Sequence, residues 1–291
     1  MHALIYYPLV STAVYLATTA ILFIASILLP NVPLLAFAAR LFSAYGSLIA
    51  CASYGTIASA VLRCFNLHHA YAQWTTAKSF KWVCRYTMGV RFEILDDGEK
   101  ILNSKRPMVI IGNHQSELDV LFLGCIWPTH CSVTAKKSLR HVPFLGWFMS
   151  LSGSVFIDRA HRSEATKALA GAADSMKTLK QNVFMFPEGT RSYSKEPMLL
   201  PFKKGAFHLA VQAGVDILPV VAENYSRLLD VKAKHFSPGV IRVKVLQPIS
   251  TAGMTAADVD KLTQETRNKM LETLMELAAQ PESQSKAKKT S

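Results

Sequence analysis

Charge is almost absent from the first 62 residues of this 291-residue chain, where Arg40 is the only Lys, Arg, Asp or Glu side chain. All 20 acidic residues and the other 31 of the 32 basic residues come after it. The chain is therefore not one uniform water-soluble domain. It is long enough for one charged domain of about 200 residues and a separate apolar part.

Cysteine is scarce and shows no paired spacing. Neither a C-x-x-C motif nor a Cys/His cluster occurs, which argues against a disulfide framework or a structural zinc site. This usage is typical of a domain that faces a reducing compartment, and we expect no metal and no cofactor. A G-x-S-x-G motif is also absent, so no serine-hydrolase nucleophile is predicted. The five cysteines are Cys51, Cys64, Cys84, Cys125 and Cys131.

The net charge of +12 belongs almost wholly to the part after residue 62. A strongly basic surface predicts an anionic partner: a nucleic acid, an anionic lipid or a polyphosphate ligand. The apolar segments described next favour a lipid bilayer, and we expect no nucleic-acid partner.

Two apolar runs predict a membrane hairpin over residues 1–63. The first, Ala3–Leu29, carries no formal charge, and Pro30 and Pro33 then break it. The second, Leu41–Leu62, is about 33 Å long as a helix, against a hydrocarbon core of about 30 Å. Small residues in the second run predict close packing of the two helices. These residues are Ser43, Gly46, Ser47, Ser53, Gly55 and Ser59.

Two other interpretations of these runs stay open. The first run fits a cleaved signal peptide, although it lacks a basic start and exceeds the usual apolar region of about 7–15 residues. The pair also fits a re-entrant hairpin that enters one leaflet. In both hairpin versions the positive-inside rule places the following domain in the cytosol. The basic residues that support this orientation are Arg63, Lys78, Lys81 and Arg85.

Residues 64–92 mix aromatic and basic side chains, which predicts an interfacial linker with its rings at the level of the lipid headgroups. An amphipathic helix of the domain core explains the same pattern equally well. The aromatic residues are Tyr71, Trp74, Phe80, Trp82 and Tyr86.

From residue 93 to 279 the pattern predicts an α/β domain, with a mixed sheet flanked by helices. The tail 280–291 is rich in Ser and Lys and is predicted to be disordered. Strands are expected at Met108–Ile111, Ser154–Ile157, Val183–Phe186, Ile217–Val221 and Val240–Leu246. Helices are expected at Leu118–Trp127, Ser163–Lys180, Lys203–Ala213 and Ala256–Leu277.

The stretch MVIIGNHQSELDVLFLG places His114 in a turn after a strand and Asp119 in the first turn of the next helix. A carboxylate on one imidazole nitrogen leaves the other nitrogen to accept a proton, as a general base does. A structural interpretation competes with this one. Ser116 and Asp119 have the spacing of a helix capping box, and a single histidine in a loop is often a surface residue.

Three further stretches end strands with polar or special residues. FPEGTRS (186–192) offers a glycine for close backbone approach and Arg191 for a phosphate, although Glu188 fits an ion-pair partner of that arginine. SVFIDR (154–159) ends on Asp158 and Arg159. ILPVV (217–221) contains Pro219 and is expected to line a groove.

Together NHQSELD, SVFIDR, FPEGTR and ILPVV resemble, in this order and spacing, the four motif blocks of the glycerolipid acyltransferase family. The likeness runs from about Lys105 to Ile249 and is greatest to the 1-acyl-sn-glycerol-3-phosphate acyltransferases, particularly the fungal type. It implies transfer of a fatty acyl group from acyl-CoA, as co-substrate, to the sn-2 hydroxyl of lysophosphatidic acid, which gives phosphatidic acid. The N-terminal hairpin is similar to the family's membrane anchor.

The same resemblance implies the roles of the candidate site residues. His114 is the base, Asp119 orients it, and no covalent acyl-enzyme is required because the thioester is already activated. Lys136 and Arg159 are candidates for holding phosphate or the developing oxyanion, although Lys136 also fits a solvated surface lysine. The acceptor's glycerol phosphate is expected to bind at Glu188, Gly189, Thr190 and Arg191.

Other functions remain as alternatives at this point. The acceptor is glycerol 3-phosphate or another lysophospholipid in one of them. A membrane-anchored lipid hydrolase would need a nucleophile or metal that the sequence does not show, and a non-catalytic lipid-binding protein would not need His114 and Asp119. The expected location is the endoplasmic reticulum membrane or the lipid droplet, because a hairpin anchor suits either surface.

Overall fold

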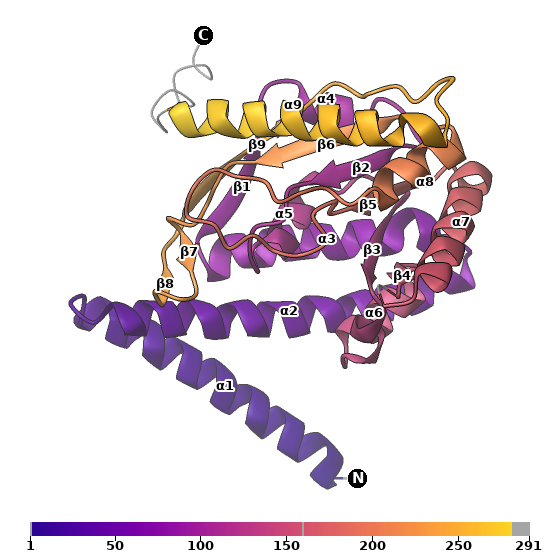
Figure 1. The fold of residues 1–291 in the computed structure, drawn as a ribbon. Helices are drawn as coiled ribbons and strands as arrows, with labels where there is room; N and C mark the ends of the chain where they lie inside the picture. The colour runs from indigo at the N-terminus through magenta and orange to yellow at the C-terminus, as the bar shows by residue number, and fades with distance from the viewer. Residues whose placement is uncertain (1, 159, 281–291) are drawn as a thin grey trace.

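Two long apolar helices open the chain and meet at a sharp turn. Helix α1 spans His2–Leu28 and α2 spans Pro33–Cys64, with Pro33 in the first turn of α2, where a missing backbone N–H does no harm. The computed structural model describes residues 2–158 and 160–280. Within these residues α1 and α2 are the two helices long and apolar enough to cross a membrane. Figure 1 shows α1 diverging from the molecule while α2 runs along its underside.

The small residues of α2 face mainly the third helix, not α1 as the hairpin prediction implied. Helix α3 spans His68–Thr87, and the Ser43 hydroxyl donates to its Thr87 carbonyl at 3.1 Å. A side chain at Gly55 would meet Thr76 of α3 at 2.6 Å. On the other side, Tyr15 of α1 packs against Gly46. Helix α2 is therefore shared between the apolar hairpin and the domain above it.

Residues 64–92, the segment predicted as an interfacial linker, contain α3 and the start of the first strand. Phe80 and Cys84 on one face of α3 are buried in a hydrophobic cluster, as the alternative of a core helix requires. Trp82 and Tyr86 on the other face are exposed. One face of α3 therefore belongs to the core, and a position of the exposed aromatic face at a membrane interface stays a prediction.

A seven-stranded mixed sheet forms the centre of the domain, in the order β1-β9-β6-β2-β5-β3-β4. Neighbouring strands are parallel except for the antiparallel pair β6–β9. The predicted mixed sheet is confirmed. The strands are β1 (Val90–Ile94), β2 (Val109–Gly112), β3 (Cys131–Lys136), β4 (Val155–Ile157), β5 (Asn182–Met185), β6 (Ile217–Ala222) and β9 (Gly239–Val245).

Helices cover both faces of the sheet and divide the core into two clusters (Figure 1). On the lower face lie α3 and α5 (Asp119–Ile126); on the upper face lie α7 (Arg162–Leu179), α8 (Gly205–Ala213) and α9 (Val259–Ala279). The smaller elements are α4 (Gly98–Leu102), α6 (Leu145–Leu151), the 3-10 turns Lys137–His141 and Ala256–Asp258, and the hairpin of β7 (Leu229–Asp230) and β8 (His235–Phe236).

Strand β6, predicted to line a groove, is buried along its whole length between β2 and β9. Its Pro219 lies at the end of the β6–β9 ladder, where its carbonyl still accepts a hydrogen bond from the Leu246 N–H at 3.0 Å. A proline is tolerated there because few ladder bonds remain to be lost. The predicted disordered tail lies outside the described residues from 281 onward.

Candidate active site

The turn after β2 brings the two candidate catalytic side chains together. Nδ1 of His114 lies 2.6 Å from Oδ2 of Asp119, the first residue of α5. Because a carboxylate accepts only, the proton of the neutral imidazole lies on Nδ1, which leaves Nε2 to accept a proton. The side chain of His114 is 19% exposed and that of Asp119 is 3% exposed. The candidate base therefore reaches the surface, while the carboxylate that holds it is buried.

The Asp119 carboxylate is held from several directions. Its Oδ2 also accepts the backbone N–H groups of Gln115 at 2.7 Å and Ser116 at 3.1 Å. Its Oδ1 accepts the phenol of Tyr225, a buried residue whose pKa is raised by burial and by the Asp119 charge. Asp119 thus braces the turn and positions the histidine at once. The capping-box alternative is wrong, because α5 begins at Asp119 itself and no side chain caps its N-terminus.

An aromatic ring fixes the plane of the imidazole. Phe186 stacks on His114 with ring centroids 4.0 Å apart and an interplanar angle of 12°. The other side of the Phe186 ring meets Phe184 edge to face, at 4.9 Å. Stacking on one face and the Asp119 hydrogen bond at one edge leave the imidazole little freedom to rotate.

Two amides on either side of His114 tie the turn to the end of β6. Asn113 donates to the Ala222 carbonyl at 2.8 Å and accepts the Ala222 N–H at 2.9 Å. Gln115 donates to the carbonyls of Ala222 and Glu223, at 3.1 and 2.9 Å. Catalytic residues at strand ends are commonly positioned by such rigid neighbours.

Glu188 anchors the turn to the loop after β5. Its Oε1 accepts the backbone N–H of His114 at 2.7 Å, and its Oε2 accepts that of Leu200 at 2.9 Å. Burial raises the pKa of this carboxyl, and the two amide hydrogen bonds oppose the shift. The geometry makes Glu188 a positioning residue rather than an ion-pair partner of Arg191. Direct contact of Glu188 with an acceptor stays a prediction.

Gly189 has a conformation and a neighbour that both favour glycine. Its φ is +70°, a left-handed value, and an added Cβ would lie 2.9 Å from the Lys203 side chain. The next residue, Thr190, is exposed. Lys203 therefore lies over the loop of residues 188–191, which we call the EGTR loop, and adds a positive charge to it. The sequence analysis did not predict this contribution.

Arg191 lies at the same end of the sheet as His114. The loop that carries it is joined to the catalytic turn, because the Ser192 N–H donates to the His114 carbonyl at 3.0 Å. The guanidinium donates to Glu117 at 2.9 Å and to the Tyr193 hydroxyl at 3.0 Å. It is thus pre-oriented by Glu117 and Tyr193, while its side chain remains 38% exposed.

The other predicted cations lie further along this edge. Lys136 ends β3, whose Val133 pairs in parallel with Phe184 of β5, so it is exposed at the same edge as the EGTR loop. Asp158, after β4, pairs with Lys137 at 3.1 Å, which lowers the pKa of its carboxyl to about 2. Arg159 lies outside the described residues.

An apolar pocket of about 90 Å³ lies between α2, α3, α5 and α6. Val120, which follows Asp119 in the chain, lines it together with Leu123 of α5, Phe80 of α3 and Phe148 of α6. The pocket thus lies between α5, which Asp119 begins, and the layer formed by α2 and α3. Among the described residues, no group of three or more His, Cys, Asp or Glu side chains is arranged to hold a metal ion.

The sequence predicted the polar centre of the site and missed its supports. Tyr225 lies 106 positions after Asp119, and no local pattern links the two residues. Phe186 belongs to the FPEGTRS motif, but its stacking on His114 depends on the pairing of β2 with β5. Glu117 and Tyr193 could have been suspected only from their closeness to the two motifs.

Known proteins are similar to this chain in sequence and in fold. Residues 93–223 match the family described as Acyltransferase. The chain is 44% identical over 235 residues to the 1-acyl-sn-glycerol-3-phosphate acyltransferase of Saccharomyces cerevisiae, covering 81% of this chain and 76% of that protein. The human enzyme named 1-acyl-sn-glycerol-3-phosphate acyltransferase beta is 40% identical, covering 70% of this chain and 71% of that one.

A solved structure supports the same fold at lower identity. The crystal structure of the 1-acyl-sn-glycerophosphate (LPA) acyltransferase PlsC from Thermotoga maritima superposes with a TM-score of 0.62 at 22% identity, covering 92% of this chain and 99% of that chain. The fold is therefore shared, including the mixed sheet flanked by helices. Together with the extensive identity to the yeast and human proteins, this shows that the chain is an acyltransferase and belongs to the family of the 1-acyl-sn-glycerol-3-phosphate acyltransferases.

Proposed function

We propose that this acyltransferase moves a fatty acyl group from acyl-CoA to the sn-2 hydroxyl of 1-acyl-sn-glycerol 3-phosphate, lysophosphatidic acid, and so makes phosphatidic acid for phospholipid synthesis. The observation that carries the proposal is the His114–Asp119 pair, held beside a loop with an exposed arginine. The choice of 1-acyl-sn-glycerol 3-phosphate as the acceptor is supported by the names of the yeast and human relatives.

The pair supplies general base catalysis. Nε2 of His114 takes the proton of the acceptor hydroxyl, and the resulting oxygen nucleophile forms a bond to the thioester carbonyl carbon. The carbon–sulfur bond then breaks, and the proton passes from His114 to the thiolate of coenzyme A. Asp119 stabilises the imidazolium between these two proton transfers. The thioester is already activated, so the reaction needs no acyl-enzyme.

We infer places for the two substrates from the remaining features. Arg191 and Lys203 lie by the EGTR loop and offer positive charge to the acceptor phosphate. Lys136 offers a further cation at the same edge. The apolar pocket that Val120 lines accommodates part of an acyl chain.

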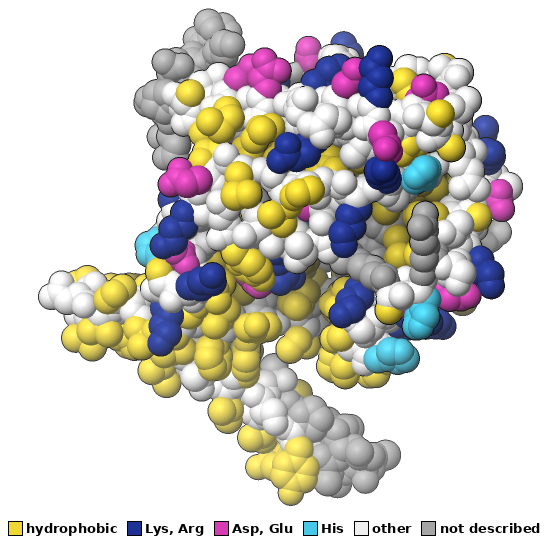
Figure 2. All heavy atoms as spheres, in the orientation of Figure 1, with side chains coloured by type: hydrophobic (Ala, Val, Ile, Leu, Met, Phe, Trp, Pro, Cys, Tyr) yellow, Lys and Arg dark blue, Asp and Glu magenta, His cyan; other side chains and the backbone are white. Residues whose placement is uncertain are grey.

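The apolar helices bring this site to the lipid acceptor. Figure 2 shows hydrophobic side chains gathered over α1 and α2, with Lys and Arg side chains bordering them on the domain above. We infer that α1 and α2 hold the enzyme in a bilayer and that the basic domain faces the cytosol, where soluble acyl-CoA is available. The proposed location is the endoplasmic reticulum membrane or the lipid droplet.

Transfer from labelled acyl-CoA to a panel of acceptors tests the proposal. The panel contains lysophosphatidic acid, glycerol 3-phosphate and lysophosphatidylcholine, each assayed with the purified enzyme and with His114→Ala. We expect the fastest transfer to lysophosphatidic acid and none above background in the variant. Preferred acylation of another acceptor would replace the proposed substrate, and activity of the variant equal to that of the wild type would overturn the mechanism.

A further inference from the structure

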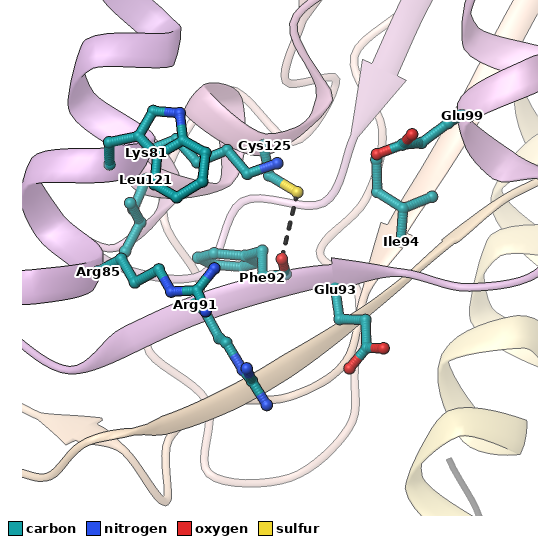
Figure 3. Close-up of a pocket in the computed structure, with 10 residues that line it drawn as sticks. Lys81, Arg85, Arg91, Phe92, Glu93, Ile94, Glu99, Leu121 and Cys125 are labelled. Atoms are coloured by element: carbon teal, nitrogen blue, oxygen red, sulfur yellow. Dashed lines mark hydrogen bonds between the residues drawn. The ribbon is translucent and has the colours of Figure 1, made fainter. Parts of the chain in front are cut away.

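A basic pocket of about 270 Å³ lies between α3, β1, α4 and α5, and none of the candidate site residues lines it. Figure 3 shows Lys81 and Arg85 extending from α3 on one side of β1, whereas Arg91 extends from β1 away from Lys81; Glu93 and Glu99 lie toward the other end. Among the described residues, no ion pair joins Lys81, Arg85 or Arg91 to a carboxylate. We call this cavity the basic pocket.

A fourth cation, Lys78, lies next to the cations that line the basic pocket. Lys78, one turn before Lys81 on α3, has its pKa lowered by burial and by the positive charge of Lys81. An anion bound among these side chains would relieve that repulsion and form charge-assisted hydrogen bonds. The end of the pocket lined by Lys81 and Arg85, away from Glu93 and Glu99, is therefore the part that suits a phosphate group.

A second cavity of about 530 Å³ lies between α1, α2 and the end of α3. Its walls include Phe23 of α1, Gly46 of α2 and Val83 of α3, and they are almost wholly apolar. Helices α1 and α2 are long and apolar enough to cross a membrane. On the membrane location proposed above, on which this inference rests, we expect the groove to open toward lipid. We call it the apolar groove.

The two cavities adjoin at the exposed face of α3. Trp82 lines the basic pocket and Tyr86, one turn later, lines the apolar groove. Their rings stack with centroids 6.4 Å apart at an interplanar angle of 15°, and the Arg85 guanidinium lies 5.7 Å from the Trp82 ring. Tryptophan and tyrosine prefer the level of lipid headgroups, where one end of the ring is apolar and the other is wet.

We propose that these two cavities form an accessory site for one anionic phospholipid of the bilayer. Its phosphate binds beside Lys81 and Arg85 in the basic pocket, to which Arg91 adds a third positive charge from β1, and an acyl chain follows the Trp82–Tyr86 pair into the apolar groove. The site is separate from the catalytic centre, because α5 stands between the basic pocket, which Leu121 lines, and the apolar pocket, which Val120 lines.

Native mass spectrometry of the full-length protein in mild detergent tests this site without requiring catalysis. The probes are phosphatidylserine and phosphatidylcholine with identical chains, neither of which is the proposed substrate or product. We expect one phosphatidylserine to be retained, with phosphatidylcholine bound at least about tenfold more weakly. Both lipids carry the phosphate, but only phosphatidylserine has a net negative headgroup charge, and the choline of phosphatidylcholine would bring a further positive charge to the cations of the pocket. Equal retention of the two lipids would overturn the proposal.

Variants locate the lipid on the molecule. Removing both guanidiniums in Arg85→Gln/Arg91→Gln should weaken phosphatidylserine retention by about tenfold or more. The matched control Lys167→Gln/Lys261→Gln removes two positive charges from α7 and α9 on the upper face and should bind as the wild type does. Unchanged retention in the arginine variant, or an equal loss in the control, would contradict the assignment.

Competition separates a lipid from a free anion. Inorganic phosphate and glycerophosphoserine carry the headgroup chemistry without acyl chains, so both should displace the bound lipid far less well than a short-chain phosphatidylserine does. Equal displacement by glycerophosphoserine and by the short-chain lipid would show that no acyl chain binds in the apolar groove, and would contradict that part of the proposal. Thermal unfolding of each variant shows whether lost binding reflects a lost fold.

Discussion

The phenol of Tyr225 donates a hydrogen bond to the same Asp119 carboxylate that receives Nδ1 of His114, with one carboxylate oxygen for each partner. Tyr225 comes from the segment after β6, whereas the other two residues belong to the turn after β2. The Asp119 carboxylate is therefore held by partners from two separate segments of the chain.

Removing the base should stop the reaction without unfolding the enzyme. In His114→Ala we expect kcat to fall by about 10²–10⁴-fold or more, the range typical of general base catalysis. Asp119→Asn should also lower kcat, because an amide at this position no longer fixes the Nδ1–H tautomer. Initial rates with labelled acyl-CoA measure both effects. Membrane association and thermal unfolding of His114→Ala should match the wild type, and a lost fold would make the rate uninformative.

Tyr225→Phe tests the support behind the carboxylate. We expect a smaller loss of kcat than in Asp119→Asn, and a decrease of about 1–3 kcal/mol in the free energy of unfolding, because a buried carboxylate oxygen loses its donor. Denaturant titration and initial rates provide the two readouts. The exposed Tyr45 offers the control Tyr45→Phe, which should change neither. Equal kcat in Tyr225→Phe and the wild type would mean that the phenol plays no part in orienting His114.

Arg191→Ala should chiefly raise KM for the phosphate-bearing acceptor. Because Glu117 and Tyr193 hold the guanidinium, Tyr193→Phe should raise the same KM to a smaller extent. Titration of each substrate at saturating concentrations of the other separates the two KM values. If only the KM for acyl-CoA rose, Arg191 would belong to the donor site instead.

Gly189→Ala combines backbone strain with a contact to Lys203. An alanine at a φ of +70° is strained by about 1 kcal/mol, and its Cβ would push Lys203 away from the EGTR loop. We expect lower stability and a raised KM for the acceptor. The matched control is Gly171→Ala in α7, where nothing lies within 4 Å of the added Cβ and helix propensity favours alanine. A Gly189→Ala enzyme as active and stable as the wild type would contradict this account.

Glu188 should give stability a characteristic pH dependence. Burial raises the pKa of its carboxyl above the ordinary value of 4.5. The folded protein therefore binds this proton more tightly than the unfolded chain does, and the contribution of Glu188 falls as pH rises from about 4.5 through the raised pKa. The free energy of unfolding of the wild type minus that of Glu188→Gln, measured by denaturant titration between pH 4 and 8, should decrease with pH. A difference that increased with pH would mean that the amide hydrogen bonds dominate.

Local sequence patterns predicted those strands and helices whose signal lies within a short stretch of the chain. The strands containing Ile110, Phe184 and Val220 were predicted within one or two residues, since apolar runs bounded by turns are short-range signals. Strands β1 and β3 were missed, because their mixed composition shows a strand only once β9 or β5 pairs with it. The helix predicted from Ala256 begins instead with a 3-10 turn, in which Thr255 and Asp258 form a capping box.

The site divides in the same way. His114 and Asp119 lie five residues apart, so a motif predicts their meeting. Tyr225 and Phe186 reach the same turn through the order of the strands, which depends on the packing of the whole sheet. Glu188 was noticed for its charge, but its hydrogen bonds to backbone amides 74 and 12 positions away follow only from the folded loop.

Helix α2 also determines how this enzyme can be handled. Its Cys51 and the Cys84 thiol of α3 belong to one hydrophobic cluster, which continues to Phe122 beneath the sheet. Cutting the chain after residue 64 would not release a water-soluble catalytic domain, because the cut uncovers the apolar side of α3. Because α2 is proposed to lie in a bilayer, we expect the catalytic half to keep its fold only in detergent or lipid. Solubility and activity are expected to be lost together on truncation.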